Sequence, residues 1–541
     1  MPEIAFNLLD EPWIRLMGED CAVRECTLPQ ALLESHRYRR LAGELPTQDV
    51  AILRLLLAVL HTVFYRVDLD GEEDPIEEPT QALQRWQRLW KAGCFPEAPI
   101  RNYLNEWKER FWLFHPEHPF FQVPSAAAGT QYTAAKLNGE LSESSNKVRL
   151  FPVRAGQDKD GLSYAEAARW LVTLIGFDDS STKVETGTGV GWLGQHINLY
   201  AMGENLFETL MLNLVLLRNG TEVWGENIPS WERNNPKAAK KREIAVPDNQ
   251  AELLTLQSRR VLLYRENNKV VKYSTTGGDF FGNGGSVNAF SEQMTQWIVR
   301  KAGKNKAPQA IPKMPNPDKQ MWRDFETIVS QGTIQPGIAR WIACLRQKRI
   351  LKDASIRFCS VGATYDSKKS SIADTVSDHL DFHVSLLEEA GKLWDKLVQD
   401  EIAQTEKAAW HLGMLAEDLF KAAGGQPDSN AQTSRKDLAS QTYYGQVDIP
   451  FRKWLASIDP DLGDGETRRA EKDAQWRREA YRIALEQGRK MVQNAGQAAF
   501  TGRWIDGTFY SSPDAFNYFS WQLKKLFKIE NSMKEEADEK P

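Results

Sequence analysis

Residues 6–14 read FNLLDEPWI, a run of apolar, acidic and aromatic residues close to the amino terminus. The stretches at 13–17 and 21–24 then form two strand-like runs across a Gly-Glu-Asp turn. Thr27 follows at the position of a helix N-cap, with Pro29 in the first turn of the helix. The opening run therefore predicts a small β unit followed by a helix.

The chain downstream of this unit is long enough for more than one domain. It has 541 residues, whereas a single hydrophobic core stops growing at roughly 250 to 300 residues. Its first part mixes helical periodicity with strand-like runs, including a hairpin pattern across Asn267 and Asn268. The predicted elements are helices over 47–66, 79–92 and 164–177 and a hairpin over 259–273. We therefore predict a large mixed α/β domain over residues 1–374.

The pattern changes beyond residue 375. Apolar residues recur there at helical spacing, with almost no strand signal. The helical stretches are 378–423, 446–457, 466–499 and 513–529. Four helical stretches predict a four-helix bundle over residues 375–541, so the fold class is α+β.

The charge of the chain is unevenly distributed. The net charge is −5, yet residues 300–369 hold 15 Lys or Arg against 5 Asp or Glu. Any nucleic-acid site is therefore local. The loop residues Lys301, Lys304, Lys306 and Lys313 suit phosphate contacts, although an ordinary solvated face explains them equally well.

Several features favour a cytoplasmic protein. The amino terminus carries Glu3 and Asp10 and has no basic start before an apolar stretch, so it does not resemble a secretory signal. The apolar stretch at 50–64 is interrupted by Arg54 and His61, which favours a buried helix over a membrane span. The five cysteines are scattered and form no CxxC pair, so we expect packed thiols.

No familiar enzyme motif is present. The sequence lacks GxxxxGK[ST], HExxH, GxSxG and the kinase set. Prolines around His115 and His118 favour a structural loop, and His379 with His383 is expected on one face of the first bundle helix. We assign no catalytic residue, metal or cofactor. Two alternatives remain: a stand-alone metal-dependent nuclease whose carboxylates are dispersed, and a helical scaffold unconnected to DNA.

Two polar segments are candidates for contact with nucleic acid. Residues 187–194, the glycine segment, read GTGVGWLG. Clustered glycines let a backbone approach another surface and present bare N–H groups to it, although a plain flexible loop is the competing interpretation. The second segment is a polar turn at 365–371, which carries the adjacent lysines Lys368 and Lys369.

The run at residues 6–14 resembles the amino-terminal signature of the CasA family, the large subunit of the type I-E CRISPR surveillance complex Cascade. The order of parts is similar along nearly the whole chain, from a Leu-Phe-His-Pro segment at 113–116 through the glycine segment, basic hairpin and polar turn to the bundle. The resemblance implies a non-catalytic subunit that recognises the protospacer-adjacent motif in duplex DNA. It also implies that the subunit promotes duplex opening and R-loop formation and recruits the helicase-nuclease.

The same resemblance implies roles for particular residues. The motif is read from the minor groove by the glycine segment, a hairpin lysine and a wedge that helps to open the duplex. These map to Gly187, Gly189 and Gly191, to Lys272 with Lys269 as the alternative, and to Lys368 with Lys369. A loop that contacts the crRNA-bearing subunits maps to Asn146, Lys147, Arg149 and Phe151. The role of holding the displaced single strand maps to Arg478, Arg482 and Arg489, which lie on roughly one helix face.

The sequence departs from the family pattern in two places. The wedge has lysines where other members place amide residues, and the zinc-type cysteine clusters of some members are absent. The implied partners are the other Cascade subunits with crRNA, double-stranded target DNA, the displaced single strand and the helicase-nuclease, with no membrane.

Overall fold

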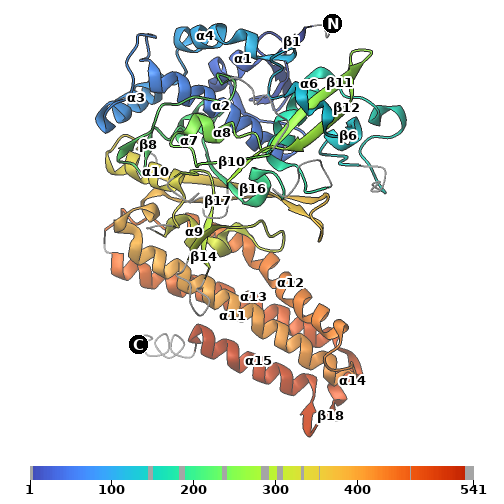
Figure 1. The fold of residues 1–541 in the computed structure, drawn as a ribbon. Coiled ribbons are helices and arrows are strands. Elements are labelled where there is room, and N and C mark those ends of the chain that lie inside the picture. Colours follow the sequence, from blue (N-terminus) through green and yellow to red (C-terminus); the bar gives the residue numbers. More distant parts are fainter. Residues whose placement is uncertain are drawn as a thin grey trace. The chain divides into compact units, whose positions relative to one another are not determined.

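The computed structural model divides the chain into two compact units. It describes residues 4–143, 150–181, 189–233, 241–281, 291–300, 309–330, 334–352, 354–463 and 465–529. The first unit is Met1–Pro317 with Thr327–His379, and the second is Asp318–Glu326 with Leu380–Pro541 (Figure 1). The boundary that the sequence suggests, between residues 374 and 375, lies within strand β17 (Ile372–His383).

The opening run forms the predicted β unit. Strand β2 (Ile14–Gly18) pairs antiparallel with β3 (Val23–Cys26) and with β4 (Tyr38–Leu41). The Trp13 indole donates to the Leu8 carbonyl, and both side chains are fully buried. Thr27 and Gln30 form a reciprocal capping box at the start of α1 (Leu28–Leu33), which confirms the predicted helix start.

The core of the first unit is helical. Helix α2 (Pro46–Arg66) is buried along most of its length, and α3 (Pro79–Ala92) and α6 (Tyr164–Phe177) match the predicted helices. By length and composition α2 is the one described helix able to cross a membrane, but 94% of the qualifying window is buried inside the protein, as expected for a core helix. The other helices are α4 (Glu97–Glu106), α5 (Ala134–Leu137), α7 (Leu206–Asn213), α8 (Gln250–Leu254), α9 (Glu326–Val329) and α10 (Gly337–Gln347).

Two three-stranded sheets position the candidate site. One has the order β11-β12-β6, from β11 (Arg259–Glu266), β12 (Lys269–Gly277) and β6 (Thr130–Thr133). The turn residues Asn267 and Asn268 both have positive φ, as the predicted two-residue hairpin requires. The other sheet has the order β17-β16-β7, with β16 (Ser355–Tyr365) and β7 (Asn198–Met202).

Short strand pairs complete the first unit. They are β1 (Ala5–Asn7) with β5 (Trp112–Phe114), β8 (Leu217–Arg218) with β9 (Glu222–Val223), β10 (Arg242–Ile244) with β13 (Asp279–Phe281), and β14 (Trp297–Arg300) with β15 (Gln309–Pro312).

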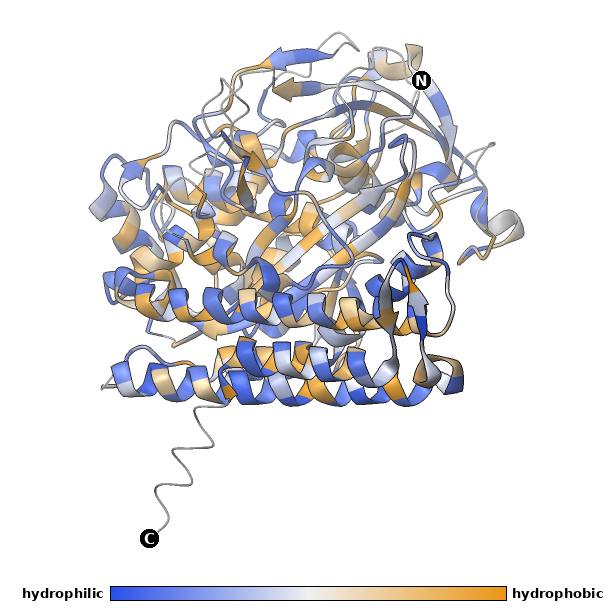
Figure 2. Cartoon of the chain, turned by 90° about the horizontal axis from the view of Figure 1, so that it is seen from below, coloured by the Kyte–Doolittle hydropathy of each residue, from blue (hydrophilic) through white to orange (hydrophobic). Residues whose placement is uncertain are grey.

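The second unit is built on four long helices, as predicted. They are α11 (Lys392–Ala422), α12 (Asn430–Ala456), α13 (Gly465–Asn494) and α15 (Ser512–Phe527). Short α14 (Gly496–Thr501) and the hairpin of β18 (Arg503–Ile505) and β19 (Thr508–Tyr510) precede the last helix. Figure 2 shows hydrophilic and hydrophobic residues alternating along these helices, which is the pattern of amphipathic packing.

Two predicted bounds of the bundle are wrong. Residues 378–383 belong to β17, because this stretch pairs with β16 instead of starting a helix. Helix α12 begins at Asn430, not near residue 446. Its first half is too polar to show apolar periodicity, yet Ser429 caps it and it buries Ala439 and Tyr443.

Candidate nucleic-acid interface

The segment that follows α6 links several of the sequence-predicted site residues. Helix α6 ends at Phe177, and residues 178–181, the anchor segment, read Asp-Asp-Ser-Ser. Asp178 and Asp179 are almost completely buried, which is unusual for carboxylates unless they are paired. Asp179 pairs with buried Lys136, and Asp178 pairs with Arg259 at 2.7 Å. The anchor segment is therefore a fixed internal element.

Arg259 on β11 joins the anchor segment to the glycine segment. Its Nε donates to Asp178, and its Nη2 donates to the carbonyl oxygens of Asp179 at 3.0 Å and Gly189 at 2.7 Å. The backbone N–H of Gly191 in turn donates to the Asp178 carbonyl at 2.7 Å. Buried charge is tolerated here because the guanidinium is both paired and fully hydrogen-bonded.

Two of the three predicted glycines need to be glycine for different reasons. A Cβ atom at Gly191 would lie 2.3 Å from the Gly176 carbonyl oxygen, so the close backbone approach leaves no room for a side chain. Gly189 has φ of +70° and open space around it, so only its backbone conformation disfavours other residues. Gly187 lies outside the described residues.

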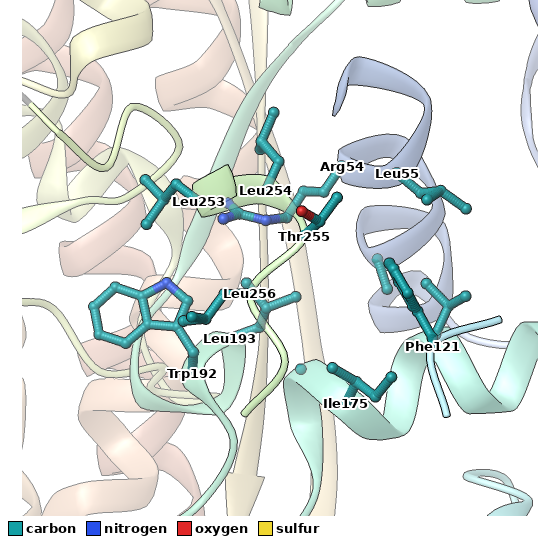
Figure 3. A pocket seen from close by; sticks show the side chains of 13 residues that line it. Arg54, Leu55, Phe121, Ile175, Trp192, Leu193, Leu253, Leu254, Thr255 and Leu256 are labelled. Atoms are coloured by element: carbon teal, nitrogen blue, oxygen red, sulfur yellow. The ribbon is translucent and has the colours of Figure 1, made fainter. Parts of the chain in front are cut away.

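The far side of the glycine segment is anchored in the core. Trp192 donates its backbone N–H to Ser258 and its indole N–H to Glu292 at 3.2 Å. Burial alone would raise the pKa of Glu292, but its bidentate pair with Arg54 outweighs burial and lowers the pKa to about 2. The cavity beside Arg54 and Trp192 holds about 20 Å³, room for one water molecule at most (Figure 3).

The predicted wedge is a tight turn between β16 and β17, here called the wedge turn (residues 366–371). Asp366 organises it by accepting hydrogen bonds from Ser370 and Ser371. Lys369 has φ of +54°, and both Lys368 and Lys369 are exposed. Ser180 donates its backbone N–H and its hydroxyl to the Lys369 carbonyl, so the anchor segment holds the wedge turn as well as the glycine segment.

The hairpin lysines lie on the neighbouring sheet. On β12, Tyr273 is fully buried and stacks on Tyr132, whose hydroxyl contacts Ser181 of the anchor segment. The adjacent Lys272 points to the other face of the sheet, because successive strand side chains alternate, and its Nζ lies 5.5 Å from the centre of the Tyr264 ring. Lys269 is exposed at the hairpin end. The structure therefore connects the hairpin to the anchor segment through Arg259 on β11 and Tyr273 on β12, and not through either lysine.

The predicted contact loop is described only at its end. Asn146, Lys147 and Arg149 lie outside the described residues. Phe151 is described, and its side chain is 89% exposed beside the equally exposed Leu150. Two adjacent apolar side chains in solvent are typical of a surface that binds a partner.

The three predicted arginines of the bundle lie on α13. All three are exposed. Arg482 forms ion pairs with Glu479 at 2.7 Å and Glu486 at 3.4 Å, so its charge is already balanced locally. No ion pair of Arg489 is recorded among the described residues.

The second unit brings His383 together with two carboxylates. Its Nε2 lies 3.3 Å from Asp459 and 3.9 Å from Asp461. Its Nδ1 accepts the backbone N–H of Ser385, which leaves Nε2 as the proton-bearing nitrogen that faces Asp459. This arrangement fits a structural contact between a histidine and two carboxylates better than a metal site. The prediction that His379 and His383 open a helix is wrong, because both lie on β17.

Sequence reasoning missed the anchor segment and Arg259. Buried ion pairs such as Asp178 with Arg259 join residues 81 positions apart, and no local pattern indicates which charges will be buried together. The signal that was available is the pair of adjacent carboxylates directly after a strongly apolar helix.

Comparisons with known proteins agree on one family. The sequence profile described as CRISPR-associated protein Cse1 matches residues 7–487. A CRISPR-associated protein CasA/Cse1 of Thermus thermophilus is 36% identical over 213 residues, which span 39% of this chain and 39% of that protein. The crystal structure of Thermobifida fusca Cse1 is similar with a TM-score of 0.80 at 29% identity, over 98% of this chain and 99% of that chain. A chain of a CRISPR RNA-guided surveillance complex shares the fold with a TM-score of 0.70 at 18% identity, over 96% and 100%.

Proposed function

The chain belongs to the family of CRISPR-associated protein Cse1, and on that premise we propose that it is the large, DNA-recognising subunit of a type I-E Cascade complex. In this role it binds the crRNA-bearing subunits and reads the protospacer-adjacent motif in duplex DNA. It then promotes duplex opening and R-loop formation, and it recruits the helicase-nuclease in the cytoplasm. A relative with the same fold is a chain of an RNA-guided surveillance complex, which supports the proposed assembly.

The observation that carries the proposal is the shared support of the glycine segment and the wedge turn. Asp178 holds Gly191, Arg259 holds Gly189, and Ser180 holds Lys369. Both surface elements are therefore fixed to four consecutive residues. A minor groove offers acceptors and negative potential, which exposed backbone N–H groups and lysines are suited to read. Gly189 is exposed, whereas Gly191 is buried and its N–H already donates to Asp178, so Gly191 shapes the segment instead of reading the groove. Lys272, or Lys269 in its place, supplies the further hairpin contact.

The subunit is proposed to have no chemistry of its own. Cleavage then belongs to the helicase-nuclease, and the displaced single strand is held along the bundle by Arg478, Arg482 and Arg489. Incubation of the purified chain with labelled DNA and Mg²⁺ or Mn²⁺ tests this directly. We expect no cutting, whereas sustained cutting that Asp459→Ala abolishes would establish a metal-dependent nuclease.

Co-purification tests the proposed assembly. A tagged chain expressed with the other subunits and a crRNA is expected to elute as one complex that binds a matched duplex carrying the motif. A complex assembled without the chain is expected to lose this binding. Unchanged duplex binding without the chain would contradict the proposal.

A further inference from the structure

The last helix of the bundle carries exposed aromatic side chains that the fold leaves unused. Helix α15 packs on its neighbours through Ala515, Phe519, Leu523 and Phe527, which are buried and spaced four residues apart. Tyr518 and Trp521 lie on the outside of the same helix and are 58% and 51% exposed. Large aromatic side chains are costly to leave in water, so a pair of them on one outer face requires an explanation.

These two rings belong to a stripe that also carries positive charge. At 100° per residue, positions 518, 521, 525 and 528 lie within a narrow sector of the helix, so Tyr518, Trp521, Lys525 and Lys528 form one aromatic–lysine stripe. The two ring centres are 6.0 Å apart, and the Lys525 ammonium lies 5.5 Å from the Trp521 ring. Gln522 donates to the Tyr518 hydroxyl at 2.7 Å and helps to fix that ring.

The charge of α15 beyond its first turn is of one sign. Residues 515–529 contain three lysines, at 524, 525 and 528, and no acidic residue. No ion pair of these lysines is recorded in the part of the chain that the structure describes. The acidic residue on the same side, Asp514, is occupied at the helix N-terminus with Ser511. A surface of aromatic rings with unbalanced lysines is complementary to a polyanion that has flat apolar groups.

The neighbouring helix adds to this surface. The Phe519 ring packs where Gly488 of α13 leaves room for it, since a Cβ atom there would lie 2.4 Å from the ring. The turn of α15 that carries Tyr518 therefore lies beside the turn of α13 that carries the exposed Arg489. Toward the other end of this helix pair, the rings of Tyr481 on α13 and Phe527 on α15 pack edge to face, with their centres 6.4 Å apart.

We propose that the aromatic–lysine stripe of α15, with Arg489 beside it, is a stacking platform for single-stranded nucleic acid. Tyr518 and Trp521 each stack on one base, while Lys525, Lys528 and Arg489 contact the phosphates. The proposal rests on the proposed function, in which the displaced strand passes along the bundle. It moves the centre of that contact from Arg482, whose charge is balanced by two glutamates, to the face of α15.

Binding of a fluorescein-labelled 20-nucleotide oligo-dT to the purified full chain tests the platform. Because both stacking rings are removed, Tyr518→Ala with Trp521→Ala should weaken binding by roughly thirtyfold or more. The matched control is Trp410→Ala with Trp504→Ala, which removes two other exposed aromatic side chains of the same unit and should leave binding unchanged. Oligonucleotides with 5-iododeoxyuridine should photo-crosslink to Trp521 or Tyr518.

The same variants separate this proposal from the function on which it rests. Motif-dependent binding of duplex by the assembled complex should survive Tyr518→Ala with Trp521→Ala, because the motif is read by the first unit. Wild-type affinity of this variant for oligo-dT would overturn the platform while leaving the proposed function intact. Loss of co-purification with the protein subunits, with oligo-dT binding retained, would also overturn it and identify the stripe as a protein-docking surface.

Discussion

Ser180 donates its backbone N–H and its hydroxyl to the carbonyl oxygen of Lys369, at 2.7 Å in each case. These two residues are 189 positions apart, and the pair ties the wedge turn to the segment that also holds the glycine segment. The two surfaces therefore hold a fixed relation to each other, and a change in the anchor segment should reach both.

Removal of the Ser180 hydroxyl should weaken the wedge without touching its charge. Ser180→Ala loses one of the two bonds to the Lys369 carbonyl, and a typical hydrogen bond contributes about 0.5–1.5 kcal/mol. We expect a several-fold loss in duplex affinity of the assembled complex, with the melting temperature lowered by no more than a few degrees. Ser180→Thr keeps the hydroxyl and should restore affinity, and a Thr variant as weak as the Ala variant would argue against a positioning role.

Charge reversal in the wedge turn should change the salt dependence of DNA binding. Each lysine that contacts a phosphate contributes about 0.9 to the slope of log affinity against log salt. Lys368→Glu with Lys369→Glu should therefore weaken duplex binding and lower this slope by about 2. Lys91→Glu with Lys348→Glu, also exposed lysines of the first unit, provides the control. Equal slopes for both double variants would show that the wedge turn makes no phosphate contact.

Alanine substitutions at three glycines should separate crowding from backbone strain. Gly191→Ala places a Cβ atom against the Gly176 carbonyl and should cost about 1–3 kcal/mol. Gly189→Ala has space but needs a left-handed conformation, which costs roughly 1–2 kcal/mol. Gly445→Ala, inside α12 with open space, should stabilise by up to about 1 kcal/mol. Thermal unfolding measures all three, and a wild-type melting temperature for Gly191→Ala would contradict the close approach.

The stability of the bundle should depend on pH through Glu401. Burial, followed by the hydrogen bond to Asp473, raises the pKa of Glu401 from 4.5 to about 8, although Arg477 opposes the shift. An unfolded chain ionises this carboxyl above pH 4.5 while the folded one resists, so stability falls between pH 4.5 and 8 and then levels off. Glu401→Gln should remove this part of the slope in thermal unfolding from pH 5 to 9. The control Glu466→Gln, which changes an exposed glutamate of the same unit, should leave the slope of stability against pH as in the wild type. An unchanged slope in Glu401→Gln would exclude Glu401 as the source of this pH dependence.

Much of the secondary structure was predictable because its signals are local. Helix α3 begins at Pro79 and is capped by Gly93 with positive φ, as the two residues indicate. The Asn267-Asn268 turn likewise locates the hairpin. His379 and His383 misled the prediction because a spacing of four residues places side chains on one face of a helix and also on one face of a strand. Only pairing with β16 distinguishes the two.

The support of the candidate site was not predictable, because it depends on contacts between distant residues. The exposed lysines Lys368 and Lys369 were found from the sequence as charges in a polar turn. Their partner Ser180 looks like any serine in a loop, and Arg259 looks like an ordinary residue at the edge of a basic hairpin. The short segment Asp318–Glu326 joins the second unit through Trp322, which stacks on Phe451, and nothing in the local sequence indicates that partner.

The most direct test of the account is the ratio of affinities of the crRNA-loaded complex for two matched duplexes, one with and one without the protospacer-adjacent motif. Titrations at a single fixed salt concentration compare the wild-type chain with Lys272→Glu, Lys368→Glu and Lys369→Glu combined. We predict that the triple variant assembles normally but binds the two duplexes almost equally. A variant complex that still prefers the motif-bearing duplex as strongly as wild type would contradict the assignment of motif reading to this surface.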